Sequence, residues 1–126
     1  MLRVLNAADG SATSFELHFS DGTLAGTNLV RDIRPGNISS GIVNLTAFGN
    51  GVLFGADDGG GGGVEPWFSD GTFAGTVPLG DLRAGAASSA ATGFTTVTSG
   101  LAVFVASTDT VGQELFVTNG TAAGTG

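Results

Sequence analysis

The chain has no cysteine, no tyrosine and no lysine among its 126 residues, and only one histidine and one tryptophan. Without cysteine it can form neither a disulfide framework nor a cysteine-ligated metal site. Four arginines against eleven carboxylates give a formal net charge of −7. Because nucleic acids and anionic membranes attract proteins through cationic side chains, neither is expected as a partner.

The sequence also lacks a long apolar run. No stretch approaches the roughly 18 apolar residues of a membrane-spanning helix. The N-terminal residues do not contain the roughly 7–15 apolar residues of a secretory signal. Any export signal is therefore expected outside this chain.

Glycine is the most frequent residue, with 23 copies, and several of them belong to a repeated motif. Residues 16–27 read ELHFSDGTLAGT, residues 65–76 read EPWFSDGTFAGT, and residues 114–125 read ELFVTNGTAAGT. The copies begin at positions 16, 65 and 114, so the period is a constant 49 residues. A fixed period of roughly 20–50 residues is typical of solenoids, propellers and arrays.

Short apolar stretches separated by Gly, Asp, Asn and Ser predict strands and turns along the whole chain. No window has a helical period, so the expected fold is all-β. Asn50-Gly51 lies between two such stretches and predicts a hairpin with a type I′ turn. Ten strands are expected, at residues 2–8, 15–20, 27–33, 44–48, 52–56, 66–69, 76–82, 94–98, 101–106 and 115–118.

Four antiparallel strands in each 49-residue unit are typical of a β-propeller blade. We expect one repeat array over residues 1–126, with a partial first blade (1–43), a second blade (44–92) and a partial third blade (93–126). The strands of the two incomplete blades cannot complete one another, which predicts a fragment of a longer array. The edge at residues 115–118 is then expected to expose unpaired backbone groups and to promote self-association.

The repeated motif resembles that of the ELWxxDGT-repeat family, bacterial proteins in which Glu-Leu-Trp-x-x-Asp-Gly-Thr-x-x-Gly-Thr recurs at about this spacing. Residues 32–40 (DIRPGNISS) and 52–59 also resemble segments of that family. The resemblance implies an exported or cell-surface protein with a propeller-like fold and no established enzymatic activity. The tryptophan of the motif is kept only at Trp67, Pro66 replaces the leucine, and Asn119 replaces the aspartate.

The motif residues are interpreted as structural rather than catalytic. His18 could act as a general base or a ligand, but Trp67 and Phe116 at the equivalent positions indicate a flat ring packed between sheets. The repeated glutamates could form a paired-acid site, but one glutamate per blade indicates that each accepts hydrogen bonds from loop backbone. The set is Glu16, His18, Asp21, Gly22, Thr23, Gly26, Glu65, Trp67, Asp70, Gly71, Thr72, Gly75, Glu114, Phe116, Asn119, Gly120, Thr121 and Gly124.

Asp57 and Asp58, like Asp9 and the turn aspartates, could supply oxygen ligands to Ca²⁺. No loop has the spacing of an EF-hand or of a calcium-binding β-roll, so no cofactor is expected. The leading hypothesis is a non-catalytic structural or interaction module of an exported or surface-associated bacterial protein. Its partners would be further repeats of the same chain or other proteins. A carbohydrate- or calcium-binding propeller segment and a polysaccharide-acting enzyme remain as alternatives.

Overall fold

The computed structural model describes residues 3–8, 15–35, 38–61, 63–83, 88–108 and 112–126, with only the backbone of 3–8. These residues contain no helix, which confirms the all-β class, and all ten expected strands are found. The strands are β1 (Arg3–Ala8), β2 (Phe15–Ser20), β3 (Thr27–Arg31), β4 (Val43–Phe48), β5 (Gly51–Ala56), β6 (Glu65–Ser69), β7 (Thr76–Pro78), β8 (Thr92–Thr98), β9 (Leu101–Thr108) and β10 (Gly112–Thr118).

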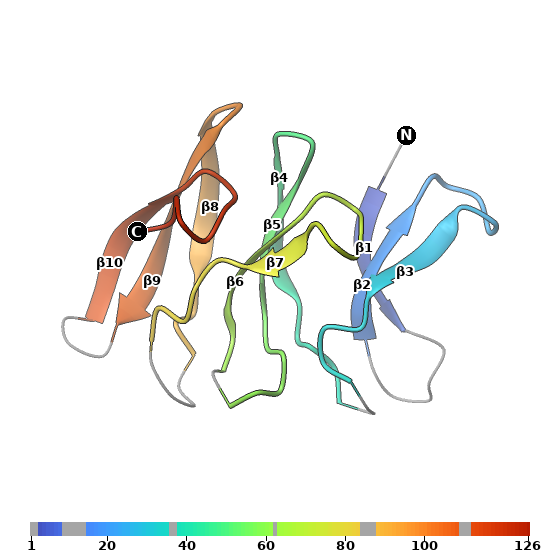
Figure 1. The fold of residues 1–126 in the computed structure, drawn as a ribbon, viewed down its shortest axis with the longest axis horizontal. Coiled ribbons are helices and arrows are strands. Elements are labelled where there is room, and N and C mark those ends of the chain that lie inside the picture. Colours follow the sequence, from blue (N-terminus) through green and yellow to red (C-terminus); the bar gives the residue numbers. More distant parts are fainter. Residues whose placement is uncertain (1–2, 9–14, 36–37, 62, 84–87, 109–111) are drawn as a thin grey trace.

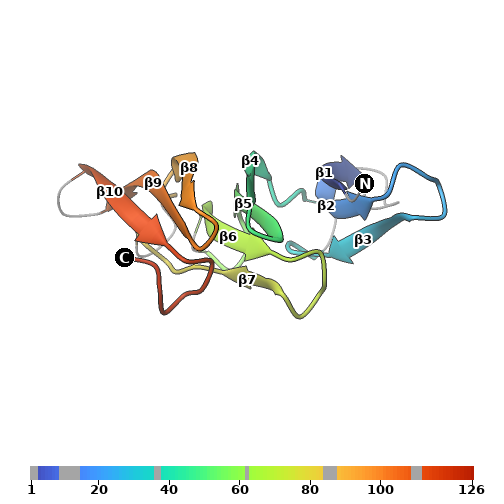
Figure 2. The same cartoon turned by 90° about the horizontal axis from the view of Figure 1, so that it is seen from above.

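The strands form three antiparallel sheets, ordered β1-β2-β3, β4-β5-β6-β7 and β8-β9-β10. The sheets stand side by side in a row, with the four-stranded sheet in the middle (Figure 1; Figure 2). Within the described residues they close into neither a barrel nor a ring.

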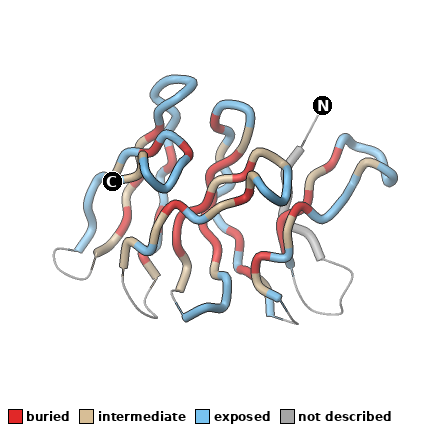
Figure 3. Tube along the Cα trace, in the orientation of Figure 1, coloured by how far each residue is buried: buried red, intermediate tan, exposed pale blue. Residues whose placement is uncertain are grey.

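The sheets pack face to face around two hydrophobic cores, and Figure 3 shows the buried segments between them. The first core lies between the first and middle sheets and consists of Leu17, Val30, Ile33, Ile42, Val52, Phe54, Ala56 and Trp67. The second lies between the middle and third sheets and consists of Phe48, Leu53, Leu79, Ala91, Phe94, Ala102, Phe104 and Ala106. Strand β5 therefore contributes one face to each core.

The segments that connect the sheets repeat the same backbone hydrogen bonds. Ser40 donates its N–H to the Phe15 carbonyl oxygen at 3.3 Å, and its own carbonyl oxygen accepts the Asp57 N–H at 2.7 Å. Ser89, 49 residues after Ser40, makes a corresponding pair of bonds: its N–H donates to the Val64 carbonyl oxygen at 3.0 Å, and its own carbonyl oxygen accepts the Ser107 N–H at 2.7 Å. Each serine thus joins the start of one hairpin to the end of a strand in the next sheet.

The turn between β4 and β5 differs from the expected type I′ turn. Phe48 pairs with Gly51, so the central residues of the turn are Gly49 and Asn50. Of these two only Gly49 has a positive φ, 57°, as in a type II′ turn. Gly51 belongs to the strand instead, where an added Cβ would collide with the carbonyl oxygen of Ser69. The type I′ prediction is wrong because the strand register centres the turn one residue earlier.

Strands β3 and β7 are shorter than expected, since they end at Arg31 and Pro78 rather than at positions 33 and 82. The Leu79 N–H still donates to the Pro66 carbonyl oxygen of β6 at 2.8 Å, but further on the Leu82 N–H donates to the Glu65 side chain at 3.0 Å. The Ile33 N–H donates to a glutamate in the same way. At Ile33 and Leu82, therefore, the backbone N–H is bonded to a glutamate side chain instead of to a neighbouring strand.

The backbone of β10 is also more fully paired than expected. Val117 exchanges two hydrogen bonds with Gly126, each 3.0 Å long. The prediction of an unpaired edge is therefore wrong at Val117, because the chain after the last motif turns back alongside β10.

Candidate functional site

All three copies of the motif end in the same closed turn. In the first copy, Asp21 Oδ1 accepts the backbone N–H of Thr23 at 2.9 Å and its hydroxyl at 2.6 Å. Thr23 Oγ1 in turn accepts the Gly26 N–H at 2.9 Å, and the Thr27 hydroxyl donates to the Thr23 carbonyl oxygen at 2.6 Å. The same four bonds recur in residues 70–76 and 119–125.

The third copy shows that this turn does not need a carboxylate. Asn119 Oδ1 accepts the Thr121 N–H at 3.0 Å and its hydroxyl at 2.6 Å, as the aspartates do. At Asp21 and Asp70 the threonine hydroxyl, followed by the backbone N–H, lowers the pKa of the carboxyl below its usual value. The turn is thus stabilised by its own residues.

The glutamate side chains of the first two copies accept hydrogen bonds from backbone N–H groups, as expected from the sequence. Glu16 accepts the Ile33 N–H at 2.9 Å and the Arg34 N–H at 3.3 Å. Glu65 accepts the Leu82 N–H at 3.0 Å and the Ser89 N–H at 3.2 Å. Burial raises the pKa of both carboxyls above the usual value, since a charged group loses hydration there.

Glu114 differs from these two glutamates, since its side chain is exposed and has no hydrogen bond to any described residue. Equivalent sequence positions therefore have different environments in the three copies.

The aromatic position of the motif is packed, as the structural interpretation requires. Trp67 is 3 % exposed and His18 8 % exposed, while Phe116 is partly buried. The Trp67 ring stacks on Phe54 with centroids 6.4 Å apart, and Phe116 stacks on Phe104 at 5.6 Å. His18 Nδ1 donates to the carbonyl oxygen of Glu16 at 3.1 Å, so this nitrogen is used within its own strand.

Arg31 crosses from the first sheet to the turn of the middle sheet. Its Nη1 donates to the Thr76 carbonyl oxygen at 2.7 Å. Its Cζ lies 4.6 Å from the centroid of the Phe73 ring and 5.9 Å from that of Trp67. The guanidinium thus links the first sheet to the middle sheet through one hydrogen bond and two cation–π contacts. We call the interface between these two sheets the first junction, and that between the middle and third sheets the second junction.

The two aspartates considered for calcium do not share a site. Asp57 Oδ2 forms an ion pair with Arg34 at 2.7 Å, and its Oδ1 accepts the Gly59 N–H at 2.8 Å. Asp58 Oδ1 accepts the Gly60 N–H at 2.8 Å. Among the described residues no three His, Cys, Asp or Glu side chains are grouped to hold a metal ion. Asp9 lies outside the described residues.

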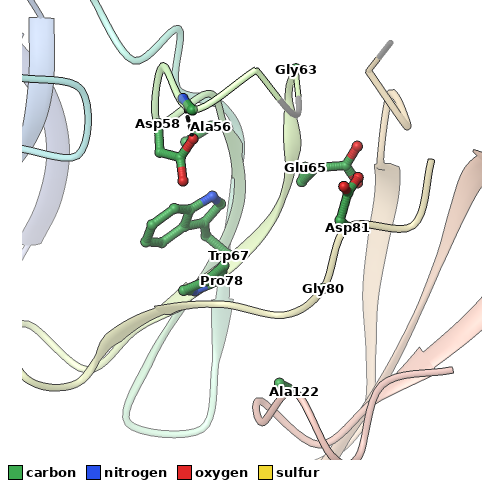
Figure 4. Close-up of a pocket in the computed structure, with 10 residues that line it drawn as sticks. Ala56, Asp58, Gly63, Glu65, Trp67, Pro78, Gly80, Asp81 and Ala122 are labelled. Carbon is green, nitrogen blue, oxygen red and sulfur yellow. Dashed lines mark hydrogen bonds between the residues drawn. The ribbon is translucent and has the colours of Figure 1, made fainter. Parts of the chain in front are cut away.

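A pocket of about 420 Å³ lies beside Trp67, where β6 and β7 separate (Figure 4). Its lining includes Asp58, Glu65 and Asp81, and none of its described lining residues is cationic. Trp67 lines the pocket, and its indole N–H has no hydrogen-bond partner among the described residues but is accessible to solvent. The pocket therefore combines three carboxyl groups with one solvent-accessible donor.

The sequence interpretation missed Gly80, Asp81 and Ala122, all of which line this pocket. One signal could have identified two of them. At the 49-residue period Gly80 stands where the first copy has Arg31, and Ala122 stands where the second copy has Phe73. Both replacements remove a large side chain.

Comparison of the chain with known protein families, characterised proteins and solved structures finds no match. In the described part of the chain, no helix is long and apolar enough to cross a membrane.

Proposed function

We propose that this chain is a non-catalytic structural module whose sheets pack face to face, and that the outer face of the third sheet receives a further sheet of the same repeat. The exposure of Leu115 carries this proposal. Leu115 is 69 % exposed, whereas Leu17 at the equivalent position is 0 % exposed and Pro66 is fully buried. The next sheet of the chain covers the equivalent face in both of those cases.

Several neighbours of Leu115 share its face and its exposure. Val117 is 41 % exposed, while its counterparts Phe19 and Phe68 pack against the two cores. Leu101, on the same side of β9 as the strand partners of Leu115 and Val117, is 37 % exposed. A contiguous apolar surface of this kind marks an interaction site, because burying each such side chain stabilises a contact by about 1.5–3 kcal/mol.

The proposed setting is a propeller-like array outside the cell, and its support is the 49-residue period together with the resemblance to the ELWxxDGT-repeat family. An acidic, lysine-free chain also fits a partner that is protein rather than nucleic acid. Trp67 is too buried to offer a ring face to a sugar, so the structure adds no support for a carbohydrate platform.

Sedimentation velocity of the purified chain over a range of concentrations tests the proposal. A second copy supplies the covering sheet in this experiment, so the wild-type chain is expected to associate as concentration rises. The double substitution L115E/V117E should abolish this association, because it places charge on the apolar face.

The matched control is Leu24→Glu, since Leu24 is 95 % exposed in the turn of the first sheet. This variant should associate like the wild type. A chain that stays monomeric at all concentrations, or equal effects of L24E and L115E/V117E, would overturn the proposal.

A further inference from the structure

Each of the three sheets has two unlike faces. The second and third residues of the motif are neighbours in one strand, and neighbouring side chains of a strand point to opposite sides of its sheet. We call the side with the second motif residue the leucine face and the side with the third the ring face. The leucine faces carry Leu17, Pro66 and Leu115, and the ring faces carry His18, Trp67 and Phe116.

Both junctions join a leucine face to a ring face. At the first junction Leu17 of β2 shares a core with Trp67 of β6. At the second junction Phe68, two residues after Pro66 and on the same side of β6, packs against the same core as Phe116 of β10. In the described part of the chain, therefore, two faces of the same kind never pack on each other.

One face of each kind remains free, at opposite ends of the row of sheets (Figure 1; Figure 2). The third sheet leaves its leucine face free, with Leu115 69 % and Val117 41 % exposed. The first sheet leaves its ring face free, since His18 lies on the side of β2 opposite to Leu17 and the first core. Leu29 pairs with His18 and so shares this face, where it is 43 % exposed.

The free ring face has the same strand register as the ring face that fills the first junction. Leu5 pairs with His18 across β1 and β2, as Phe54 pairs with Trp67 across β5 and β6. The chain thus places an apolar residue opposite the third motif residue in the first sheet, as it does in the middle sheet. A leucine face that meets the first sheet therefore meets the register to which Leu17 is packed within the chain.

We infer that the free leucine face of the third sheet binds the free ring face of the first sheet in a second copy of this chain. This inference rests on the proposed function, because it names the sheet that covers Leu115. The two contacting surfaces differ, so the contact is heterologous and each added copy leaves another leucine face free. The wild-type chain is therefore expected to associate beyond the dimer. Two third sheets packed on each other would instead join like faces, which neither junction does.

Two variants that each block one end test this inference. Leu29→Glu places a charge on the free ring face, and L115E/V117E places charge on the free leucine face. In sedimentation velocity each variant alone should associate at least about tenfold more weakly than the wild type, because each has lost one of the two surfaces of the contact. An equimolar mixture should form a dimer and nothing larger, since one variant supplies an intact leucine face and the other an intact ring face.

The matched control is Val43→Glu. Val43 is 46 % exposed in β4, and it belongs to the middle sheet, which lies between the other two (Figure 1). This variant carries the same added charge as L29E and should associate like the wild type. Because the replaced side chains are exposed, every variant should unfold close to the wild-type urea concentration, and urea denaturation checks this.

The possible failures separate this inference from the proposed function. If L29E associates like the wild type while L115E/V117E stays monomeric, third sheets pack on each other, which overturns the inference and leaves the proposed function standing. A mixture of the two variants without a dimer, or equal losses in L29E and V43E, also overturns the inference. A wild-type chain that is monomeric at every concentration overturns both.

Discussion

The Glu65 carboxylate accepts the backbone N–H of Leu82, a residue 17 positions further along the chain, at 3.0 Å. The same relationship joins Glu16 to Ile33 at 2.9 Å. In both cases a backbone donor that has left the strand ladder finds a buried acceptor, as buried N–H groups must. In these two copies the glutamate of the motif therefore connects a hairpin, by hydrogen bonds, to the segment that leads to the next sheet.

Glu65→Gln should lower the free energy of unfolding by about 1–3 kcal/mol, since the new amide keeps one acceptor oxygen but presents N–H groups to a backbone donor. Urea denaturation followed by circular dichroism measures this loss. Glu114→Gln is the matched control, because Glu114 occupies the same motif position and its side chain has no hydrogen bond among the described residues. Its effect should stay within about 0.5 kcal/mol. Equal effects of the two substitutions would show that the Glu65–Leu82 bond contributes nothing.

Gly75→Ala should destabilise the chain by about 1–3 kcal/mol, the usual cost of overpacking. An added Cβ at Gly75 would collide with the Asp70 carboxylate, which the turn holds in place. Gly100→Ala is the control, since a Cβ there has open space and Gly100 has no positive φ. Thermal denaturation of the two variants should separate them clearly. A neutral G75A would mean that the turn can rearrange without loss.

Trp67→Ala should lower the free energy of unfolding by about 3–5 kcal/mol, because it empties a large buried aromatic site. The ring is 3 % exposed and stacks on Phe54 in the first core. Leu24→Ala, at a position 95 % exposed, should change this energy by less than about 0.5 kcal/mol. Chemical denaturation gives both values, and a loss below about 1 kcal/mol at Trp67 would be incompatible with a buried ring.

The free energy of unfolding should fall as the pH rises from 4.5, the usual pKa of a glutamate carboxyl, through the raised pKa values of Glu16 and Glu65. The folded state binds their protons more tightly than the unfolded state does, so their contribution is full below pH 4.5 and declines above it. Asp21 and Asp70 have lowered pKa values and act in the opposite direction. Their contribution is present above pH 3.8 and is lost as the pH falls through their folded-state pKa values.

Urea denaturation between pH 3 and 7 should therefore show greatest stability in mildly acidic buffer. The double variant E16Q/E65Q should show a flatter profile above pH 4.5. Profiles of equal slope in the variant and the wild type would assign the pH dependence to groups other than these two glutamates.

The strands and the motif turns were predictable because their causes are local. Asp21, Gly22 and Thr23 close their turn with bonds that span at most a few residues, so the sequence alone indicates it. The turn at Gly49 and Asn50 was not predictable in type, because the register between β4 and β5 decides which residues are central. The end of β7 at Pro78 likewise depends on a contact 17 residues apart in sequence, between Glu65 and Leu82.

The pocket and the exposed outer face of the third sheet were not predictable, because no single stretch of the sequence determines them. Gly80 and Ala122 are 42 positions apart, and neither carries a recognisable chemical signature. Their contribution to the pocket can be recognised only when the copies are aligned and the contact between Arg31 and Phe73 is known. The exposure of Leu115 cannot be derived from its motif position either, since the same position is buried in both other copies.

Strand β5 makes the two cores thermodynamically dependent on one another. Leu53 belongs to one core and Phe54, the next residue, to the other, so the strand cannot detach without exposing both. Unfolding is then expected to follow nearest-neighbour coupling, in which the middle sheet opens only together with a neighbour. The outer sheets each face one core and can fray separately. Amide hydrogens in β5 should accordingly be the last to exchange with solvent, and those of β3 and β10 among the first.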